Sequence, residues 1–228
     1  MSFLQKLLGK DGTTQAAVEA KHAALRVTGR PMDVGVRGAY GLSVTSGVMA
    51  AGLAANSEIF QFRWTSNLYR CLLRSVRIEA GAIIAFTAGV GTFGMRHARV
   101  WSADGTGGTA ISFGTNDQKK LTGMATTAAP TATGVRCATT AALGAGTKTL
   151  DGNDFAGLSC GIPAVAGQTI LTPGTYLWER NTSDEYPPNY GQNEGFAIRA
   201  TVPATGTWTF NVDLEWSEVD PALIDGWT

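Results

Sequence analysis

Residues 207–219 read TWTFNVDLEWSEV, and large apolar side chains occupy alternate positions along this stretch. They are Trp208, Phe210, Val212, Leu214 and Trp216, with polar side chains between them. A strand points successive side chains to opposite faces and would collect all five on one face, whereas a helix would spread them around its circumference. At about 3.4 Å per residue the stretch would span roughly 40 Å. The pattern predicts a long, half-buried β-strand of a large sandwich or barrel.

Further strand patterns precede this stretch. Phe196, Ile198 and Ala200 alternate with polar or small residues, and the following Pro and Gly predict a hairpin turn over residues 202–206. Glycine is frequent, with 29 residues against the roughly 7% that is usual, and it punctuates the turns. Many short strands joined by Gly-rich turns predict an all-β protein, an antiparallel β-sandwich with a jelly-roll-like order of strands. The other expected strands are residues 40–44, 59–64, 69–80, 96–102, 135–140 and 170–178.

The N-terminal residues differ from the rest. Residues 15–25 (QAAVEAKHAAL) favour a short helix, and they follow a flexible, Gly-containing lead. This segment cannot form a core of its own. We therefore expect an extended arm over residues 1–30 that docks on a neighbouring molecule, followed by a single β-sandwich domain over residues 31–228.

One segment of the domain has low complexity. In residues 122–149, 21 of 28 residues are Ala, Thr or Gly. Small side chains bury little surface, so the segment is either a surface excursion or a stretch that packs tightly on another chain. We favour packing on another chain, with a plain loop as the alternative.

Composition excludes several classes. A chain of 228 residues with 44% hydrophobic and 16% charged residues can bury a large core. No apolar run reaches the ~20 residues of a membrane span, and the N-terminus lacks the apolar stretch of a secretory signal. The three cysteines are widely spaced and odd in number, which indicates free thiols made in a reducing cytoplasm.

The charges are unevenly distributed along a neutral chain. Residues 1–120 hold 14 Lys or Arg against 7 Asp or Glu, and residues 121–228 hold 4 against 11. RNA-binding and zinc-finger signatures are absent, so we expect no nucleic-acid partner. We expect basic strands to meet acidic ones of a neighbouring copy; neutralisation within one subunit is the alternative. The residues expected to make these contacts are Arg63, Arg74, Arg77 and Arg99, facing carboxylates such as Glu185, Glu194, Asp213 or Glu218.

The sequence contains strings that match cofactor-binding or catalytic motifs, but each lacks the surrounding pattern that the motif requires. Residues 89–94 (GVGTFG) match a dinucleotide-binding pattern, but a strand follows them instead of a helix, so we expect a Gly-rich turn. Asp213 and Glu215 have the spacing of a glycosidase pair, yet any i, i+2 pair on a strand has it, which favours a solvated face. The two histidines, His22 and His97, have no motif around them. We expect no enzyme activity, cofactor or metal site.

Aromatic residues suggest a further contact. In residues 186–190 (YPPNY), Tyr186 and Tyr190 flank a rigid proline pair, which makes them candidate partner contacts, with a stiffened turn as the alternative. With Trp101 and Trp178 they could form the stacking platform of a carbohydrate-binding β-sandwich. This is the alternative function from a different class.

The strings SGVMAAGLAANSEIFQFRW (residues 46–64), EGFAIRAT (194–201) and GTWTFNVDLEWSEV (206–219) resemble small structural proteins of tailed-bacteriophage virions. The resemblance covers residues 25–219 and includes no catalytic motif. It implies a sandwich body with an arm that latches onto neighbours. We therefore expect a virion protein made in the host cytoplasm: a capsid decoration or cement protein, homo-oligomeric and bound to other virion proteins, the major capsid protein first among them. A tail or adaptor component is the alternative within the virion.

Overall fold

The computed structural model describes residues 18–19, 24–25, 37–130, 133–181 and 187–221. The chain divides into two units, Met1–Met32 and Asp33–Thr228. In the first unit, β1 (Val18–Glu19) pairs with β2 (Ala24–Leu25) in an antiparallel ladder. The expected helix is therefore wrong for these residues, since an isolated helix this short is marginal in water. The other residues of the expected arm lie outside the described part of the chain.

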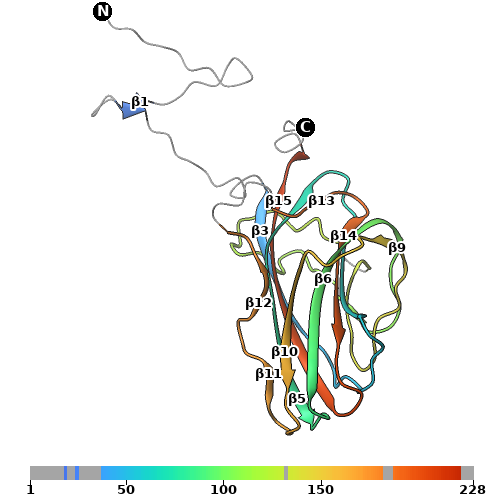
Figure 1. The fold of residues 1–228 in the computed structure, drawn as a ribbon. Helices are drawn as coiled ribbons and strands as arrows, with labels where there is room; N and C mark the ends of the chain where they lie inside the picture. Colours follow the sequence, from blue (N-terminus) through green and yellow to red (C-terminus); the bar gives the residue numbers. More distant parts are fainter. Residues whose placement is uncertain (1–17, 20–23, 26–36, 131–132, 182–186, 222–228) are drawn as a thin grey trace, which may run out of the picture. The chain divides into compact units, whose positions relative to one another are not determined.

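The second unit is built from two antiparallel β-sheets that pack against each other (Figure 1). No helix in the described part of the chain is long and apolar enough to cross a membrane. In chain order the strands are β3 (Gly38–Thr45), β4 (Ser57–Trp64), β5 (Arg70–Ile84), β6 (Gly89–Ala103), β7 (Thr109–Ala110), β8 (Val135–Cys137), β9 (Thr147–Leu150), β10 (Ala156–Ile162), β11 (Thr169–Leu171), β12 (Tyr176–Glu179), β13 (Asn189–Tyr190), β14 (Glu194–Thr201) and β15 (Thr207–Val219).

The order of the strands identifies a jelly roll. One sheet contains β10-β6-β14-β4 and continues through β8 to β7, while β9 also pairs with β6. The other contains β11-β5-β15-β3, with β12 and β13 also pairing with β5. Along the chain, β3, β5, β12 and β15 fall in one sheet and β4, β6, β10 and β14 in the other, which is the interleaving of two Greek keys. The predicted all-β, antiparallel, jelly-roll sandwich is confirmed.

The core lies between the sheets and is aromatic. Trp208, Phe210, Val212, Leu214 and Trp216 are each no more than 1% exposed, as the alternation predicts. The Phe62 ring packs across the core against that of Trp216 and within its own sheet against that of Phe196, with centroids 5.7 and 5.4 Å apart. Beyond Trp216 the alternation ends, because Ser217, Glu218 and Val219 are all buried.

The low-complexity segment packs on its own chain. β8 pairs with the edge of β4, and the backbone N–H groups of Ala138 and Leu143 donate to Ile59 O and Glu58 O, both at 2.8 Å. Ala129, Ala138 and Leu143 are buried. The described residues 122–130 and 133–149 therefore pack partly on their own domain, and packing of their exposed side chains on another chain stays a prediction. Backbone hydrogen bonds need no large side chains, so a segment of Ala, Thr and Gly can cover a sheet edge.

Two local expectations also change. Residues 89–94 form the start of β6 instead of a turn. A Cβ on Gly91 would lie 2.6 Å from Ile162 Cδ1, so this glycine leaves room for the Ile162 side chain of β10. The expected strand 170–178 is divided into β11 and β12 by a turn at Pro173 and Gly174, where Gly174 has a φ of 81°.

Candidate interaction surfaces

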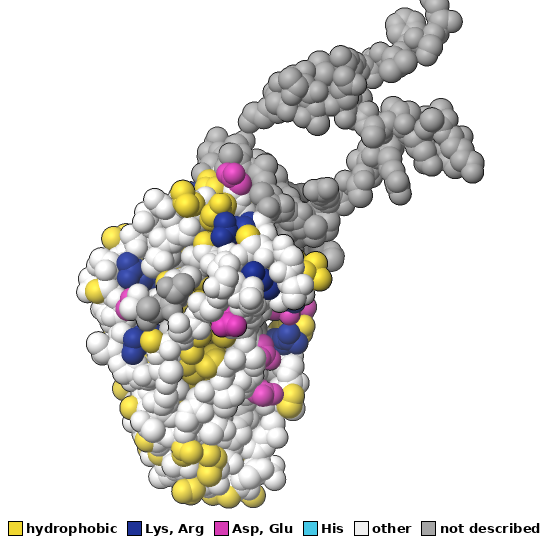
Figure 2. Space-filling view, turned by 180° about the vertical axis from the view of Figure 1, so that it is seen from behind, with side chains coloured by type: hydrophobic (Ala, Val, Ile, Leu, Met, Phe, Trp, Pro, Cys, Tyr) yellow, Lys and Arg dark blue, Asp and Glu magenta, His cyan; other side chains and the backbone are white. Residues whose placement is uncertain are grey.

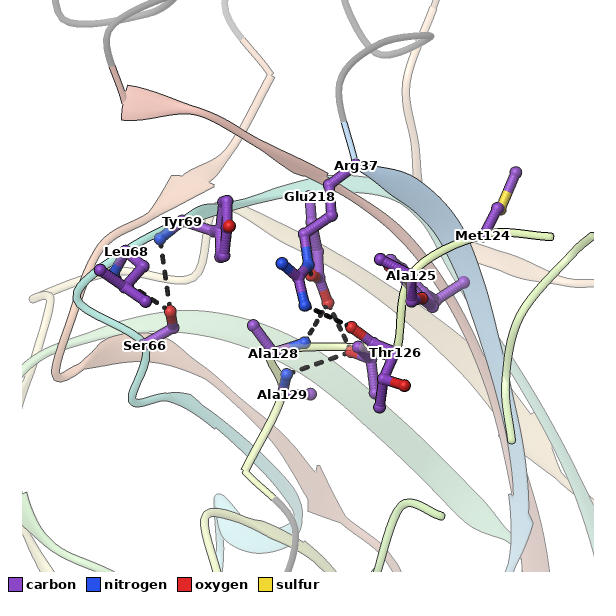
Figure 3. Close-up of polar contacts among 12 residues, drawn as sticks. Arg37, Ser66, Leu68, Tyr69, Met124, Ala125, Thr126, Ala128, Ala129 and Glu218 are labelled. Carbon is purple, nitrogen blue, oxygen red and sulfur yellow. Dashed lines mark hydrogen bonds and ion pairs between the residues drawn. The ribbon is translucent and has the colours of Figure 1, made fainter. Parts of the chain in front are cut away.

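Glu218, near the end of β15, is the centre of a buried polar cluster (Figure 3). Its side chain is fully buried. Oε1 accepts hydrogen bonds from Thr127 Oγ1 at 2.5 Å and from the Ala128 N–H at 2.8 Å, and Oε2 lies 2.9 Å from Arg37 Nε. The expectation that Glu218 faces a neighbouring copy is wrong. Position 218 continues the even-numbered, buried face of β15, a signal that sequence reasoning missed.

Arg37 joins this cluster to the beginning of the described sandwich. Its Nη2 donates to Thr126 O at 2.6 Å, and its guanidinium lies 4.1 Å from the centroid of the Tyr69 ring. Tyr40 Oη donates to Ala125 O at 2.9 Å. The cluster therefore holds residues 125–128 against one end of the sheet, the end where β3 begins and β15 finishes.

Burial raises the pKa of the Glu218 carboxyl above its ordinary value of 4.5, although the bonds from Thr127 and Ala128 and the Arg37 charge act in the opposite direction. The folded state therefore takes up this proton at a higher pH than the unfolded state. The sign follows from linkage: this carboxyl weakens folding as the pH rises through its raised pKa, and the penalty disappears as the pH falls toward 4.5.

We therefore expect wild-type protein to gain stability relative to Glu218→Gln as the pH is lowered from about 7 to 4.5. Both proteins share every other titrating group, so these contributions cancel in the difference. Urea melts of the two proteins at half-unit pH steps measure it. A difference that stays constant, or moves the other way, would contradict a raised pKa at Glu218.

The arginines expected to contact a partner are paired within the chain. Arg63 Nη1 lies 2.9 Å from Asp104 Oδ1, and Arg77 Nη2 lies 3.5 Å from Glu215 Oε1. Arg99 contacts Asp151 at 3.0 Å and Glu194 at 3.7 Å, and the half-buried Arg74 also has interactions within the structure. This arrangement corresponds to the alternative, neutralisation within one subunit.

The acidic residues on the polar face of β15 are engaged as well. Asp213 Oδ1 accepts a hydrogen bond from Asn211 Nδ2 at 3.1 Å. Glu215 pairs with Arg77 and with Lys120, whose Nζ lies 2.6 Å from Oε2. The two carboxylates thus face solvent with different partners, in accord with the solvated-face interpretation.

The aromatic contact residues have different surroundings from those expected. Tyr186 lies outside the described residues. Tyr190 is buried in β13, and its Oη lies 3.0 Å from His97 Nδ1, while the His97 ring stacks on Phe155 with centroids 3.8 Å apart. Trp101 is fully buried and Trp178 is half-buried. Of the three described members of the suggested carbohydrate platform, Trp101 and Tyr190 are therefore buried and only Trp178 is partly exposed.

Val100 in β6 is conformationally strained. It has a φ of 49°, in the left-handed region that a β-branched residue rarely adopts, and its side chain is 75% exposed. The register between β6 and β9 shifts here, between Arg99 and Ala103. Next to it, Trp101 is fully buried and its backbone N–H donates to Asn193 O at 2.8 Å. The bulge that turns Trp101 inward therefore holds Val100 in this conformation.

We expect Val100→Gly to raise the free energy of unfolding by roughly 0.5–1 kcal/mol, because relief of about 1–2 kcal/mol of left-handed strain outweighs the entropy that glycine loses on folding. Thr92→Gly is the matched control, an exposed β-branched residue of the same strand without positive φ. It should lower stability by about 0.5–1 kcal/mol. Equal losses for both variants in urea melts would contradict strain at Val100.

The opposite end of the sandwich carries no charge. Residues 46–57, 80–95, 155–178 and 200–212 contain no Asp, Glu, Lys, Arg or His. They form the loops β3–β4, β5–β6, β10–β11 and β14–β15 with the strand ends beside them. Figure 2 shows hydrophobic side chains gathered at the lowest part of the molecule, with no Lys, Arg, Asp or Glu among them.

Contacts between these loops establish that they share one end. Thr87 N donates to Thr205 Oγ1 at 2.6 Å, Gly167 N donates to Ala82 O at 2.9 Å, and Met49 bridges to Trp208. Sequence reasoning missed this surface, although the four uncharged stretches are visible in the sequence. The large apolar side chains exposed there by 43–64% are Val48, Ile83, Ile84, Val90, Val165 and Tyr176.

Among the described residues, no three His, Cys, Asp or Glu side chains gather closely enough to hold a metal ion. Comparison with protein-family models, curated proteins and solved structures found no match to this chain.

Proposed function

We propose that the protein is a structural component of a bacteriophage virion, a capsid decoration or cement protein that acts by binding the shell and its own copies. The observation that supports this proposal best is the uncharged end of the sandwich, where Ile83, Ile84, Val90 and Val165 are exposed together. Exposed apolar groups on a surface without charge are typical of a surface that becomes buried in an assembly. The resemblance of the sequence to virion proteins supports the same function.

The internal pairing of charges is consistent with this type of binding. Arg63, Arg77 and Arg99 already contact carboxylates of their own chain. Assembly would then depend on burial of apolar surface and on main-chain contacts instead of new ion pairs. Such an interface suits a permanent particle component.

The test is the position of the protein in the particle. Antibodies against the purified protein, detected with gold on intact phage particles by electron microscopy, should label the capsid surface. Label confined to the tail would assign the protein to the tail or adaptor class. Particles without label before and after partial disruption would overturn the proposal.

The arm offers a second test. Deletion of residues 1–29 should leave the melting temperature of the sandwich within a few degrees of wild type, because these residues fall in a separate unit, Met1–Met32. Incorporation into particles should fall strongly if the arm docks on a neighbouring subunit. Quantitative immunoblots of purified particles measure incorporation, and unchanged incorporation would contradict a docking role.

A further inference from the structure

We propose that the uncharged end of the sandwich is the contact surface between copies of this chain. This inference rests on the proposed function, which it deepens by assigning self-association to one end of the fold. The end is defined by residues 46–57, 80–95, 155–178 and 200–212. Its exposed apolar residues lie next to other residues of the same end: Ile84 pairs with Thr207, Val90 pairs with Gly161, and Gly167, in the loop that carries Val165, donates to Ala82 O.

The absence of charge restricts what this surface can bind. A partner that placed Asp, Glu, Lys or Arg against Ile83, Ile84, Val90 or Val165 would bury a charge with no opposite charge within these four stretches, which costs several kcal/mol per ion. The partner surface must therefore be uncharged as well. A second copy presents such a surface, because the same residues occur on it, and a two-fold axis would bring the two patches together.

Partners of other chemistry fit this end less well. A nucleic acid or an anionic membrane surface needs Lys or Arg, and these four stretches contain neither. A glycan platform needs an open aromatic ring. Phe86, Phe93, Trp208 and Phe210 at this end are each no more than 3% exposed, and Tyr176, which is 44% exposed, has the Arg77 guanidinium 5.5 Å from its ring centroid. Apart from Tyr176, the exposed groups at this end are mainly aliphatic side chains and threonine hydroxyls, which can pack and hydrogen-bond across an interface between identical chains.

A contact through this end would not cover the opposite end of the sandwich. Gly38 pairs with Glu218 at the other end of β3 and β15. The chain therefore enters the sandwich near residue 37 and leaves it near residue 221, at the end away from the apolar loops. Two copies joined through their uncharged ends would keep these chain ends outside the contact. Self-association and attachment of the arm to a different virion protein could then occur together.

The test is sedimentation of the purified full-length protein at several concentrations, in low salt and in 1 M NaCl. We expect an oligomer that salt does not weaken, since salt screens ion pairs and not apolar contacts. Val90→Asp and Ile84→Asp, at side chains 64% and 58% exposed, should each raise the dissociation constant at least tenfold, because each places a charge in the contact. Leu68→Asp is the matched control, 66% exposed in the loop between β4 and β5 at the other end, and should leave the constant unchanged.

Unchanged far-ultraviolet circular dichroism and melting temperature would verify that each variant folds. A wild-type protein that stays monomeric up to high micromolar concentration would overturn the inference, as would an oligomer that resists both substitutions or that Leu68→Asp disrupts equally. If the monomeric protein still labelled phage capsids, the proposed function would stand and the uncharged end would contact a different virion protein. If the purified protein formed the oligomer and the substitutions weakened it, but the antibodies did not label capsids, the self-association would stand and the proposed function would fail.

Discussion

Trp216→Ala should lower the free energy of unfolding by about 3–5 kcal/mol, the cost of truncating a core aromatic residue. The Trp216 side chain is fully buried at the meeting point of the two sheets. Its ring stacks on Tyr40 with centroids 5.6 Å apart and contacts the rings of Phe62 and Phe113 at 5.7 and 6.0 Å. Removing the indole would leave a cavity lined by rigid rings that cannot close it.

Glu215→Ala is the control for this substitution, one residue earlier on the opposite face. Glu215 is partly exposed and pairs with Arg77 and Lys120 on the surface. Because exposed ion pairs contribute little, we expect a loss below about 1 kcal/mol. Urea melts that ranked Glu215→Ala as the more damaging change would contradict the register of β15.

Glu218→Ala should cost about 3–5 kcal/mol, as expected when one partner of a buried ion pair is removed. The substitution would leave the Arg37 guanidinium, the Thr127 hydroxyl and the Ala128 N–H without their acceptor. Glu218→Gln keeps an acceptor for Thr127 and Ala128 and should cost less. The same urea melts compare the two variants with Glu215→Ala.

A second readout separates a local role of Glu218 from a general loss of stability. Hydrogen exchange of backbone amides in residues 124–130 should accelerate more in Glu218→Ala than in Trp216→Ala at matched global stability, because Glu218 binds this segment directly. Equal protection of the segment in both variants would show that Glu218 does not hold it. A cost below about 1 kcal/mol would contradict the cluster itself.

The pattern of the sequence was sufficient for the fold and for the inward face of its strands. Alternation depends only on the period of a strand, so Trp208 to Trp216 could be assigned to the core without knowledge of their neighbours. Interleaved Gly-rich turns indicated an antiparallel sandwich for the same local reason. Glu218 could have been assigned to the buried face by the same alternation, but a carboxylate there is interpretable only once Arg37, Thr127 and Ala128 are known to surround it.

The partners of residues far apart in sequence were decided by tertiary structure alone. Residues 122–149 have few large side chains from which packing could be inferred. Hydrogen bonds with Glu218, Arg37 and Tyr40 hold residues 125–128, backbone pairing with β4 holds residues 135–143, and no local pattern of the sequence predicts these partners. Whether Arg63 or Arg99 met a carboxylate of its own chain or of a neighbour depended on which strands the jelly roll brings together. The residues of the uncharged end come from four separate stretches of the sequence. They form one surface only because the fold places the loops β3–β4, β5–β6, β10–β11 and β14–β15 at the same end of the sandwich.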